Sequence, residues 1–113
     1  MSGIFTIKRG DTRPVLRLEL TSAAAPIDLT SATSVQIFFK QPATAALERA
    51  GVIDTPASAG VVTYTFVDAD WATGGFALGK GRLEVEVTLT SGDILTVPTS
   101  GYGEFEVVSD LGD

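Results

Sequence analysis

Four glutamates in the C-terminal part of the chain are spaced so that pairs of carboxylates share one side of an extended strand. Glu84 and Glu86 form one pair, and Glu104 and Glu106 form the other. Two residues of a strand span about 7 Å, and carboxylates roughly 5–9.5 Å apart can serve as the acid and base of a glycosidase. Both pairs alternate with apolar residues, however, and nothing nearby would keep one carboxyl protonated. We therefore predict a solvated strand face for both pairs.

A second candidate for chemistry is the stretch DADWATGG at residues 68–75, which contains two aspartates and the single tryptophan. Asp68 and Asp70 suggest a calcium loop, but the spaced oxygen ligands and closing glutamate of such loops do not follow. We predict a helical turn with Asp68 as its N-cap, and no metal site. Trp71 could stack on a sugar, although packing against the core or its edge is the favoured interpretation.

The chain contains neither histidine nor cysteine. Zinc sites thereby lose their preferred ligands, and disulfides are excluded. The commonest general base of enzymes is missing, and the serines and threonines have no basic partner in the pattern. We therefore predict no catalytic site, no enzyme activity and no cofactor.

Length and composition describe the kind of molecule that must position these residues. The 113 residues fit one domain, with an expected core from about residue 4 to residue 108 and a short acidic tail over 109–113. A formal charge of −6 argues against a nucleic-acid partner. No apolar run reaches the roughly 18–20 residues of a membrane span, so we expect no membrane association. The N-terminus lacks the apolar core of a signal peptide, which predicts synthesis in a cytoplasm without the usual export.

The dominant hydrophobic period is two, which is typical of strands with one face in the core and one in water. No helix of crossover length separates the strands, so the pattern predicts an all-β fold, an antiparallel β-sandwich of about six to eight short strands. The predicted core residues are Leu16, Leu18, Val35, Ile37, Phe39, Tyr64, Phe66, Leu83, Val85, Val87, Phe105 and Val107.

Turn residues separate these strands at fairly even spacing. Arg9-Gly10-Asp11 has the sequence of an adhesion tripeptide, but it stands between two predicted strands, where glycine and aspartate are ordinary turn residues. We predict a corner there. Thr90–Asp93 predicts a hairpin loop in which Gly92 holds positive φ. Residues 43–50, ATAALERA, contain helix formers and are interpreted as one helical turn or a long loop.

The charges are unevenly distributed along the chain. Residues 1–20 carry four basic and two acidic side chains, whereas residues 84–113 carry seven acidic side chains and no basic one. Two interpretations stay open: terminal strands that lie side by side and neutralise each other, or a polar surface that meets its complement on another subunit. The candidate partner contacts are Arg13, Arg17, Trp71, Tyr102, Glu104 and Glu106.

The order of the motifs is more specific than any one of them. Along the chain stand IKRGDTRP (7–14), PIDLTSA (26–32), GVVTY (60–64), the Asp68–Gly75 stretch, LEVEVT (83–88), SGD (91–93) and TVP (96–98). This order resembles the small domain found at the N-terminus of baseplate upper proteins of tailed phages, which also stands alone in many phage and prophage genomes. The resemblance covers about Ile4 to Val108.

The resemblance implies an immunoglobulin-like sandwich that acts by contact and without cofactors. It implies a non-enzymatic virion protein, an adaptor or accessory subunit that docks on tail, baseplate or head components. Its partners would be other virion proteins in a symmetric assembly, and it would be made in a bacterial cytoplasm. Two alternatives stay open: a capsid decoration or head-fibre module, and a carbohydrate-binding module that uses Trp71 and Tyr102 against host glycans.

Overall fold

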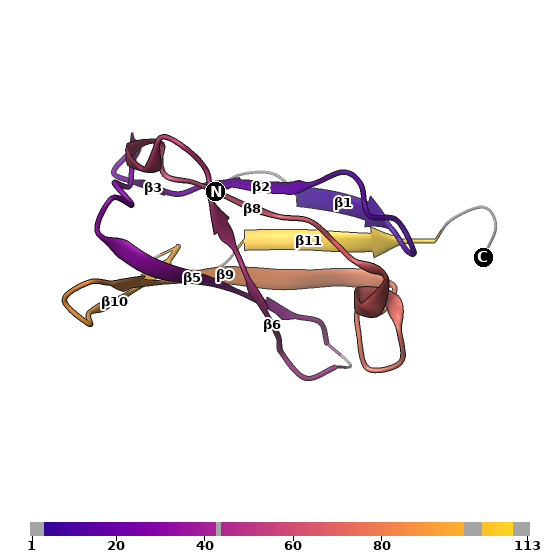
Figure 1. Ribbon diagram of the computed structural model, residues 1–113. Helices are drawn as coiled ribbons and strands as arrows, with labels where there is room; N and C mark the ends of the chain where they lie inside the picture. Colours follow the sequence, from indigo (N-terminus) through magenta and orange to yellow (C-terminus); the bar gives the residue numbers. More distant parts are fainter. Residues whose placement is uncertain (1–3, 43, 99–102, 110–113) are drawn as a thin grey trace.

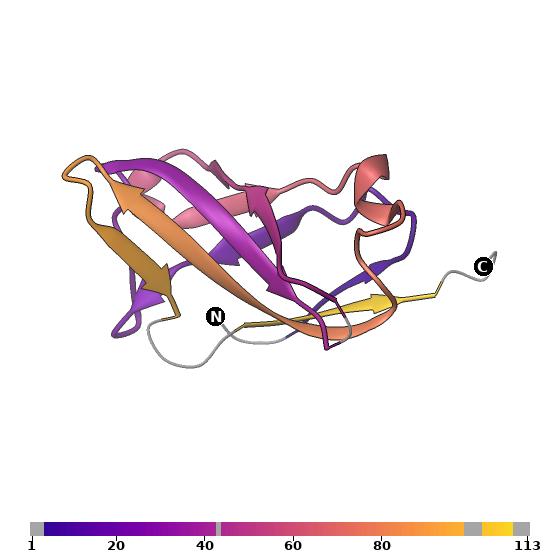
Figure 2. The ribbon, with the colours of Figure 1, turned by 90° about the horizontal axis from the view of Figure 1, so that it is seen from below.

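Two packed β-sheets form the immunoglobulin-like sandwich of this protein (Figure 1). The computed structural model describes residues 4–42, 44–98 and 103–109. The strands of the larger sheet are, in spatial order, β1 (Ile4–Lys8), β11 (Gly103–Val108), β9 (Gly79–Leu89), β5 (Ala32–Lys40) and β6 (Leu47–Ala50), with β10 (Ile94–Val97) beside the second half of β9. In Figure 2 the outer side of β5, β9 and β10 faces the viewer.

The smaller sheet covers the other side of the core. Its strands are β2 (Leu16–Glu19), β8 (Val61–Tyr64) and β7 (Val52–Ile53), and β3 (Thr21–Ser22) pairs with β4 (Ala25–Pro26) in a separate hairpin. Two 3₁₀ turns, η1 (Ala57–Ala59) and η2 (Asp68–Trp71), connect the strands. The described residues thus form eleven strands, more than the predicted six to eight, because three of them are only two residues long.

The period-two pattern places the core as predicted. Every predicted core residue is buried except Tyr64, which is half-buried. Val85 and Val87 of β9 have no exposed surface, and Phe39 and Phe105 meet edge to face with ring centroids 5.3 Å apart. The inward side chains of the two sheets therefore interdigitate, as in other sandwiches.

The sheet is not wholly antiparallel, which corrects one prediction. β1 and β11 pair in parallel, with Phe5 beside Phe105 and Lys8 beside Val108. No hairpin joins these strands, because nearly the whole chain lies between them, so the usual reason for an antiparallel pair is absent. The terminal strands do lie side by side, as one of the two charge interpretations expected.

The prediction of a helical turn or loop at residues 43–50 is wrong for its second half. Residues 47–50 form β6, which pairs with β5 and places Glu48 beside Phe38. The chain then crosses to the smaller sheet at Gly51, whose N–H donates to the Val35 carbonyl. A Cβ atom at Gly51 would stand 2.7 Å from Val62 Cγ1, so a side chain would collide with the core at this crossing.

Arg9-Gly10-Asp11 is a corner, as predicted. Gly10 has φ +92°, and the Asp11 N–H donates to the Lys8 carbonyl at 3.1 Å. The Arg9 N–H donates to the Val108 carbonyl, which fixes the corner to the end of β11. The hairpin loop before β10 is also confirmed, with Gly92 at φ +91°. Of the predicted acidic tail, only Ser109 belongs to the described residues.

Candidate interaction surface

The predicted partner contacts do not gather in one patch. Arg13 is exposed in the corner after β1, and Arg17 lies on β2, where it forms an ion pair with Glu19 at 2.7 Å. Glu104 and Glu106 lie on β11 in the larger sheet. Arg17 and these carboxylates therefore belong to different sheets, and Arg13 belongs to neither. Tyr102 lies outside the described residues.

The cross-strand neighbours of Glu104 and Glu106 also differ from the expected arginines of the N-terminal segment. On one side they are Arg82 and Lys80 of β9, and on the other they are residues of β1. The carboxylates of β11 therefore lie beside basic residues of their own sheet. The register gives them no neighbour among the arginines of the N-terminal segment that were expected to neutralise them.

Trp71 packs within the molecule, as predicted. Its ring stacks on Phe66 with centroids 5.5 Å apart and an interplanar angle of 17°. The indole Nε1–H donates to the Asp11 carbonyl at 3.0 Å, which ties η2 to the corner after β1. One face of the ring and its only polar atom are thus occupied, so nothing at Trp71 favours a sugar platform.

The cap of η2 differs from the prediction. Asp68 is exposed, and Val67 occupies the N-cap position. Asp70 is the aspartate that organises this turn, because it is 1% exposed and its Oδ2 accepts a bond from the Val67 N–H at 3.0 Å. The error has a physical reason: Asp68 has the right position for a cap, but Asp70 is held inward by hydrogen bonds from partners on two other elements, one of them a residue 21 positions away in the sequence.

Those partners are Arg49 of β6 and Tyr64 of β8. Arg49 Nε donates to Asp70 Oδ1 at 2.8 Å, and the Tyr64 hydroxyl donates to Oδ2 at 2.6 Å. The Arg49 guanidinium also lies 5.7 Å from the ring centroid of Phe76. This cluster joins one strand of each sheet to η2, and every polar atom of the carboxylate is satisfied.

The electrostatics of the cluster follow from burial and from the charge of Asp70. Burial, together with the hydrogen bond to Asp70 and its charge, raises the pKa of Tyr64 to about 12. Burial disfavours the charged form of Arg49, but the hydrogen bond and charge of Asp70 outweigh it and raise the pKa of the guanidinium. The cluster therefore holds a hydrogen-bonded ion pair and a neutral phenol, and removing one partner of the pair would leave the other charge without compensation.

The described residues contain no candidate metal site. Among the described residues, no group of three or more carboxylate, histidine or cysteine side chains could hold a metal ion. Nor does any described helix have the length and apolar character needed to cross a membrane.

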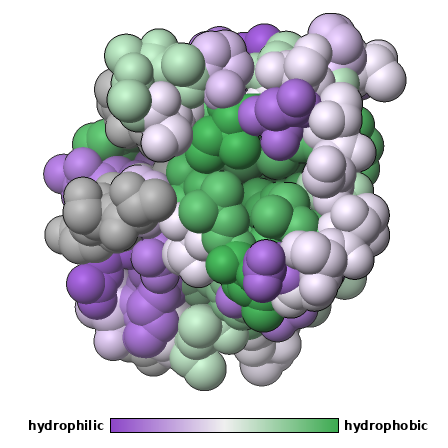
Figure 3. All heavy atoms as spheres, turned by 90° about the vertical axis from the view of Figure 1, so that its left-hand side faces the viewer, coloured by the Kyte–Doolittle hydropathy of each residue, from purple (hydrophilic) through white to green (hydrophobic). Residues whose placement is uncertain are grey.

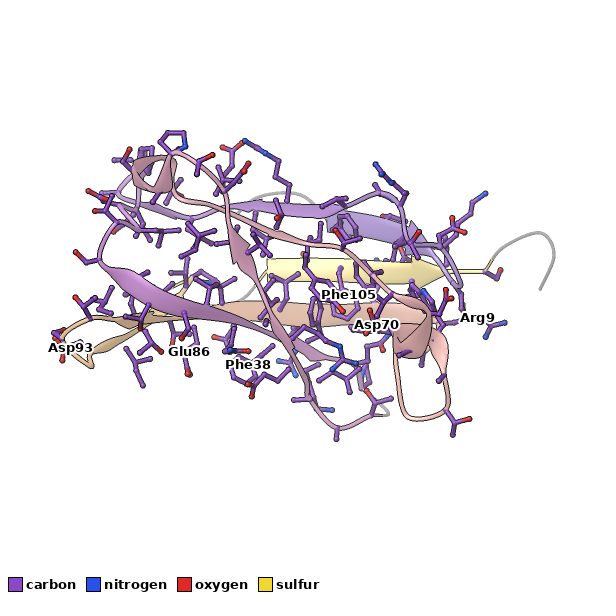
Figure 4. All side chains as sticks on the ribbon, in the orientation of Figure 1. Arg9, Phe38, Asp70, Glu86, Asp93 and Phe105 are labelled. Carbon is purple, nitrogen blue, oxygen red and sulfur yellow. The ribbon has the colours of Figure 1, made fainter. Side chains whose placement is uncertain are left out.

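A broad polar surface remains on the larger sheet. We define its outer face as the side chains that point away from the smaller sheet, namely Gln36, Phe38 and Lys40 of β5, Glu48 of β6, Lys80, Arg82, Glu84 and Glu86 of β9, and Glu104 and Glu106 of β11. Figure 4 shows Phe38 and Glu86 on this side, whereas Phe105 lies between the layers. No other layer of the described structure covers the outer face (Figures 1 and 2).

One half of the outer face is acidic. Phe38 lies in register between Glu48 and Glu84, and Gln36 lies beside Glu86. Phe38 is half-buried by these neighbours. We call this group of five residues the acidic half, and it presents an aromatic ring framed by carboxylates.

The other half is basic along β5 and β9. Lys40 of β5 lies beside Arg82 of β9. Lys80 precedes Arg82 by two residues on β9, so its side chain is on the same face. We call these three residues the basic half. They border a shallow depression of about 180 Å³, whose walls are Lys40, Pro42, Lys80, Gly81, Arg82 and Glu104. Lys40 Nζ donates to the carbonyls of Gln41 and Thr44, so its position at the wall is fixed.

A third surface lies at the end of the sandwich that carries β10 and β3. Figure 3 shows apolar side chains gathered there in a hollow between polar ones. β10 contributes Ile94, which is 61% exposed, to this end of the molecule. Nothing in the described structure identifies what would cover this hollow.

No protein-family model matches the chain, and no curated protein matches it. Among solved structures, it is similar to CopC from Methylosinus trichosporium OB3b, with a TM-score of 0.49 and 13% sequence identity. That similarity covers 96% of this chain and 86% of the other. A likeness at this level says nothing about function, so the surfaces described above carry the functional argument.

Proposed function

We propose that this protein is a non-enzymatic structural subunit of a phage virion that acts by docking on other virion proteins. The observation that carries the proposal is the outer face of the larger sheet. It presents ten side chains on four adjoining strands, eight of them charged, and leaves them uncovered. A charged sheet face of this kind suits recognition of a protein partner, because complementary charges steer docking and fix register.

The order of sequence motifs supports the virion part of the proposal. The corner at Gly10, the Tyr64 strand and the Glu-rich strand β9 stand in the same sequence as in the baseplate domain that the chain resembles. Each of these segments serves the sandwich: the corner positions β1, Tyr64 joins the Asp70 cluster, and β9 pairs with three strands. The resemblance thus concerns the elements that build the fold.

The test is to look for the chain in particles. Phage particles released from bacteria that encode it are purified on a density gradient, and their proteins are identified by quantitative mass spectrometry. We expect the chain at a fixed ratio to the tail or capsid subunits, and antibody labelling in electron micrographs then separates tail from head. Particles that lack the chain in a lysate that contains it would refute the proposal.

A further inference from the structure

The outward residues of β9 follow an unusual charge order. They are Lys80, Arg82, Glu84 and Glu86, two basic residues followed by two acidic ones. The inward residue Leu83 lies at the centre of this order and is 2% exposed. If the strand is laid antiparallel on a copy of itself about Leu83, each basic residue meets an acidic one.

From this order we propose that the outer face of the larger sheet binds the same face of a second copy of this chain about a two-fold axis. The axis lies in the plane between the facing sheets of the two copies, runs perpendicular to β9 and passes over Leu83. Arg82 of each copy then faces Glu84 of the other, and Lys80 faces Glu86. Because a two-fold interface uses the same patch on both subunits, one charge order supplies four ion pairs.

Sheet twist does not disrupt this arrangement. Packed sheets cross at about 30°, so the central residues, closest to the axis, stay opposite one another. Lys80 and Glu86 lie about 10 Å along the strand from Leu83. At a 30° crossing their strands diverge there by about 5 Å, which the long side chains of lysine and glutamate can span.

The aromatic ring of the acidic half also faces a cation of the basic half. The two-fold axis places Phe38 of the acidic half opposite Lys40 of the partner copy, at the wall of the depression in the basic half. A lysine ammonium near an aromatic face is an attractive pair. The acidic half therefore supplies a ring and the carboxylates of Glu84 and Glu86, and the basic half supplies the cations that face them.

The described cross-strand neighbours of Glu84 and Glu86 within one copy are uncharged. Across the adjoining strands, Glu84 lies beside Phe38, and Glu86 lies between Gln36 and Thr96. In the registers that the structure describes, neither carboxylate has a basic side chain directly across from it. The basic half of a second copy would bring cations to these carboxylates.

The size of the surface predicts a weak complex. Four strands at about 4.8 Å and four outward rows at about 7 Å give a patch of roughly 19 by 21 Å. This is smaller than the roughly 800 Å² per partner of a standard stable interface. We expect a micromolar dimer whose affinity falls with salt, because its rim charges are screened. The inference deepens the proposed docking function and rests on it, naming the partner as a second copy.

The test uses two variants that each destroy self-complementarity. Lys80→Glu with Arg82→Glu makes the outward side of β9 wholly acidic, and Glu84→Lys with Glu86→Lys makes it wholly basic. Sedimentation equilibrium should show that each variant alone self-associates at least about tenfold more weakly than the wild type. An equimolar mixture of the two should form heterodimers at least as well as the wild type forms dimers.

A matched control changes the same charge elsewhere. Glu19→Lys with Asp54→Lys alters two exposed carboxylates next to strands of the smaller sheet, and it should leave self-association unchanged. Heterodimers in the mixture also show that both variants are folded. A wild-type chain that stays monomeric at millimolar concentration and low salt would overturn the inference, as would a mixture without heterodimers. Neither result bears on whether the chain is found in virions.

Discussion

The Asp70 cluster allows the most quantitative prediction about stability. Asp70→Ala removes the acceptor for three donors, namely Arg49 Nε, the Tyr64 hydroxyl and the Val67 N–H. Breaking a buried ion pair by removing one partner costs about 3–5 kcal/mol. The Arg49 side chain is 28% exposed, so water recovers part of its solvation and we lower the expected loss to about 2–4 kcal/mol.

Denaturant unfolding followed by tryptophan fluorescence measures this loss directly, since Trp71 lies in the same turn as Asp70. At about 4 °C per kcal/mol for a domain of this size, the melting temperature should fall by about 8–16 °C. Asp68→Ala is the matched control, because Asp68 is exposed two residues away, and its effect should stay within about 0.5 kcal/mol. An Asp70→Ala loss no larger than that of Asp68→Ala would refute the reasoning.

A double-mutant cycle separates the ion pair from the rest of the cluster. Arg49→Met keeps an unbranched apolar stem but leaves Asp70 buried without its cation. If the pair acts as a unit, the double variant with Asp70→Ala should be at least about 1 kcal/mol more stable than the two single losses predict. Additive losses would show that Asp70 acts mainly through Tyr64 and the backbone of η2.

Four further outcomes follow from the same structure. Tyr64 has a folded pKa of about 12 against an ordinary value of 10.0, so the free energy of unfolding should fall as pH rises between these values; Tyr64→Phe should remove that slope in alkaline unfolding curves. Gly10→Ala should destabilise by about 1 kcal/mol, because alanine is strained at φ +92°, and a stability unchanged in denaturant titrations would contradict this. Val85→Asp should cost more than about 4 kcal/mol in the same assay, because Val85 is fully buried and the carboxylate would have no partner. If Arg13 and Arg17 form a second contact with a partner subunit, Arg13→Glu with Arg17→Glu should leave the domain folded by circular dichroism and slow its docking on particles in a salt-dependent way; salt-independent docking, together with loss of folding, would show that these charges serve the domain itself.

The predictable parts of the fold are those that a local pattern determines. Leu83, Val85 and Val87 could be placed in the core because alternation on one strand identifies its buried face. Gly10 could be placed at a corner because turn chemistry is also local. β6 was not predicted, because its residues favour a helix and do not reveal that the segment pairs with β5. In the fold, that pairing overrides the helix preference.

The unpredicted parts depend on contacts between distant segments. Asp70 and Arg49 are 21 residues apart and follow no common period, so only the packing of η2 against β6 brings them together. The parallel pairing of β1 with β11 likewise joins the two ends of the chain. Such pairings depend on the whole topology. The strand pattern reduces the number of possible topologies but does not select one of them.

The basic half of the outer face was not predicted from the sequence, because two glycines interrupt the pattern of β9. β9 begins at Gly79, but Gly79 and Gly81 interrupt the apolar alternation, so the pattern identified a strand only from Leu83 onward. A Cβ atom at Gly81 would stand 2.5 Å from the ring of Phe105, which shows that this ring fills the inward position of a missing side chain. The signal that could have found the basic half is the alternation of Lys80, Arg82, Glu84 and Glu86 itself.

β9 therefore has two sides whose roles can be separated by mutation. Its inward residues pack against both sheets, so a polar change at Val85 unfolds the domain before it affects any partner. Its outward residues lie outside the core, with Lys80, Arg82 and Glu84 exposed and Glu86 half-buried. Exchanging their charges should therefore alter the free energy of folding little, and under the proposed dimer it should alter the free energy of assembly strongly. If the outer face binds a partner as proposed, changes at Lys80, Arg82, Glu84 and Glu86 would alter the choice of partner, while the inward residues would keep the register of the larger sheet.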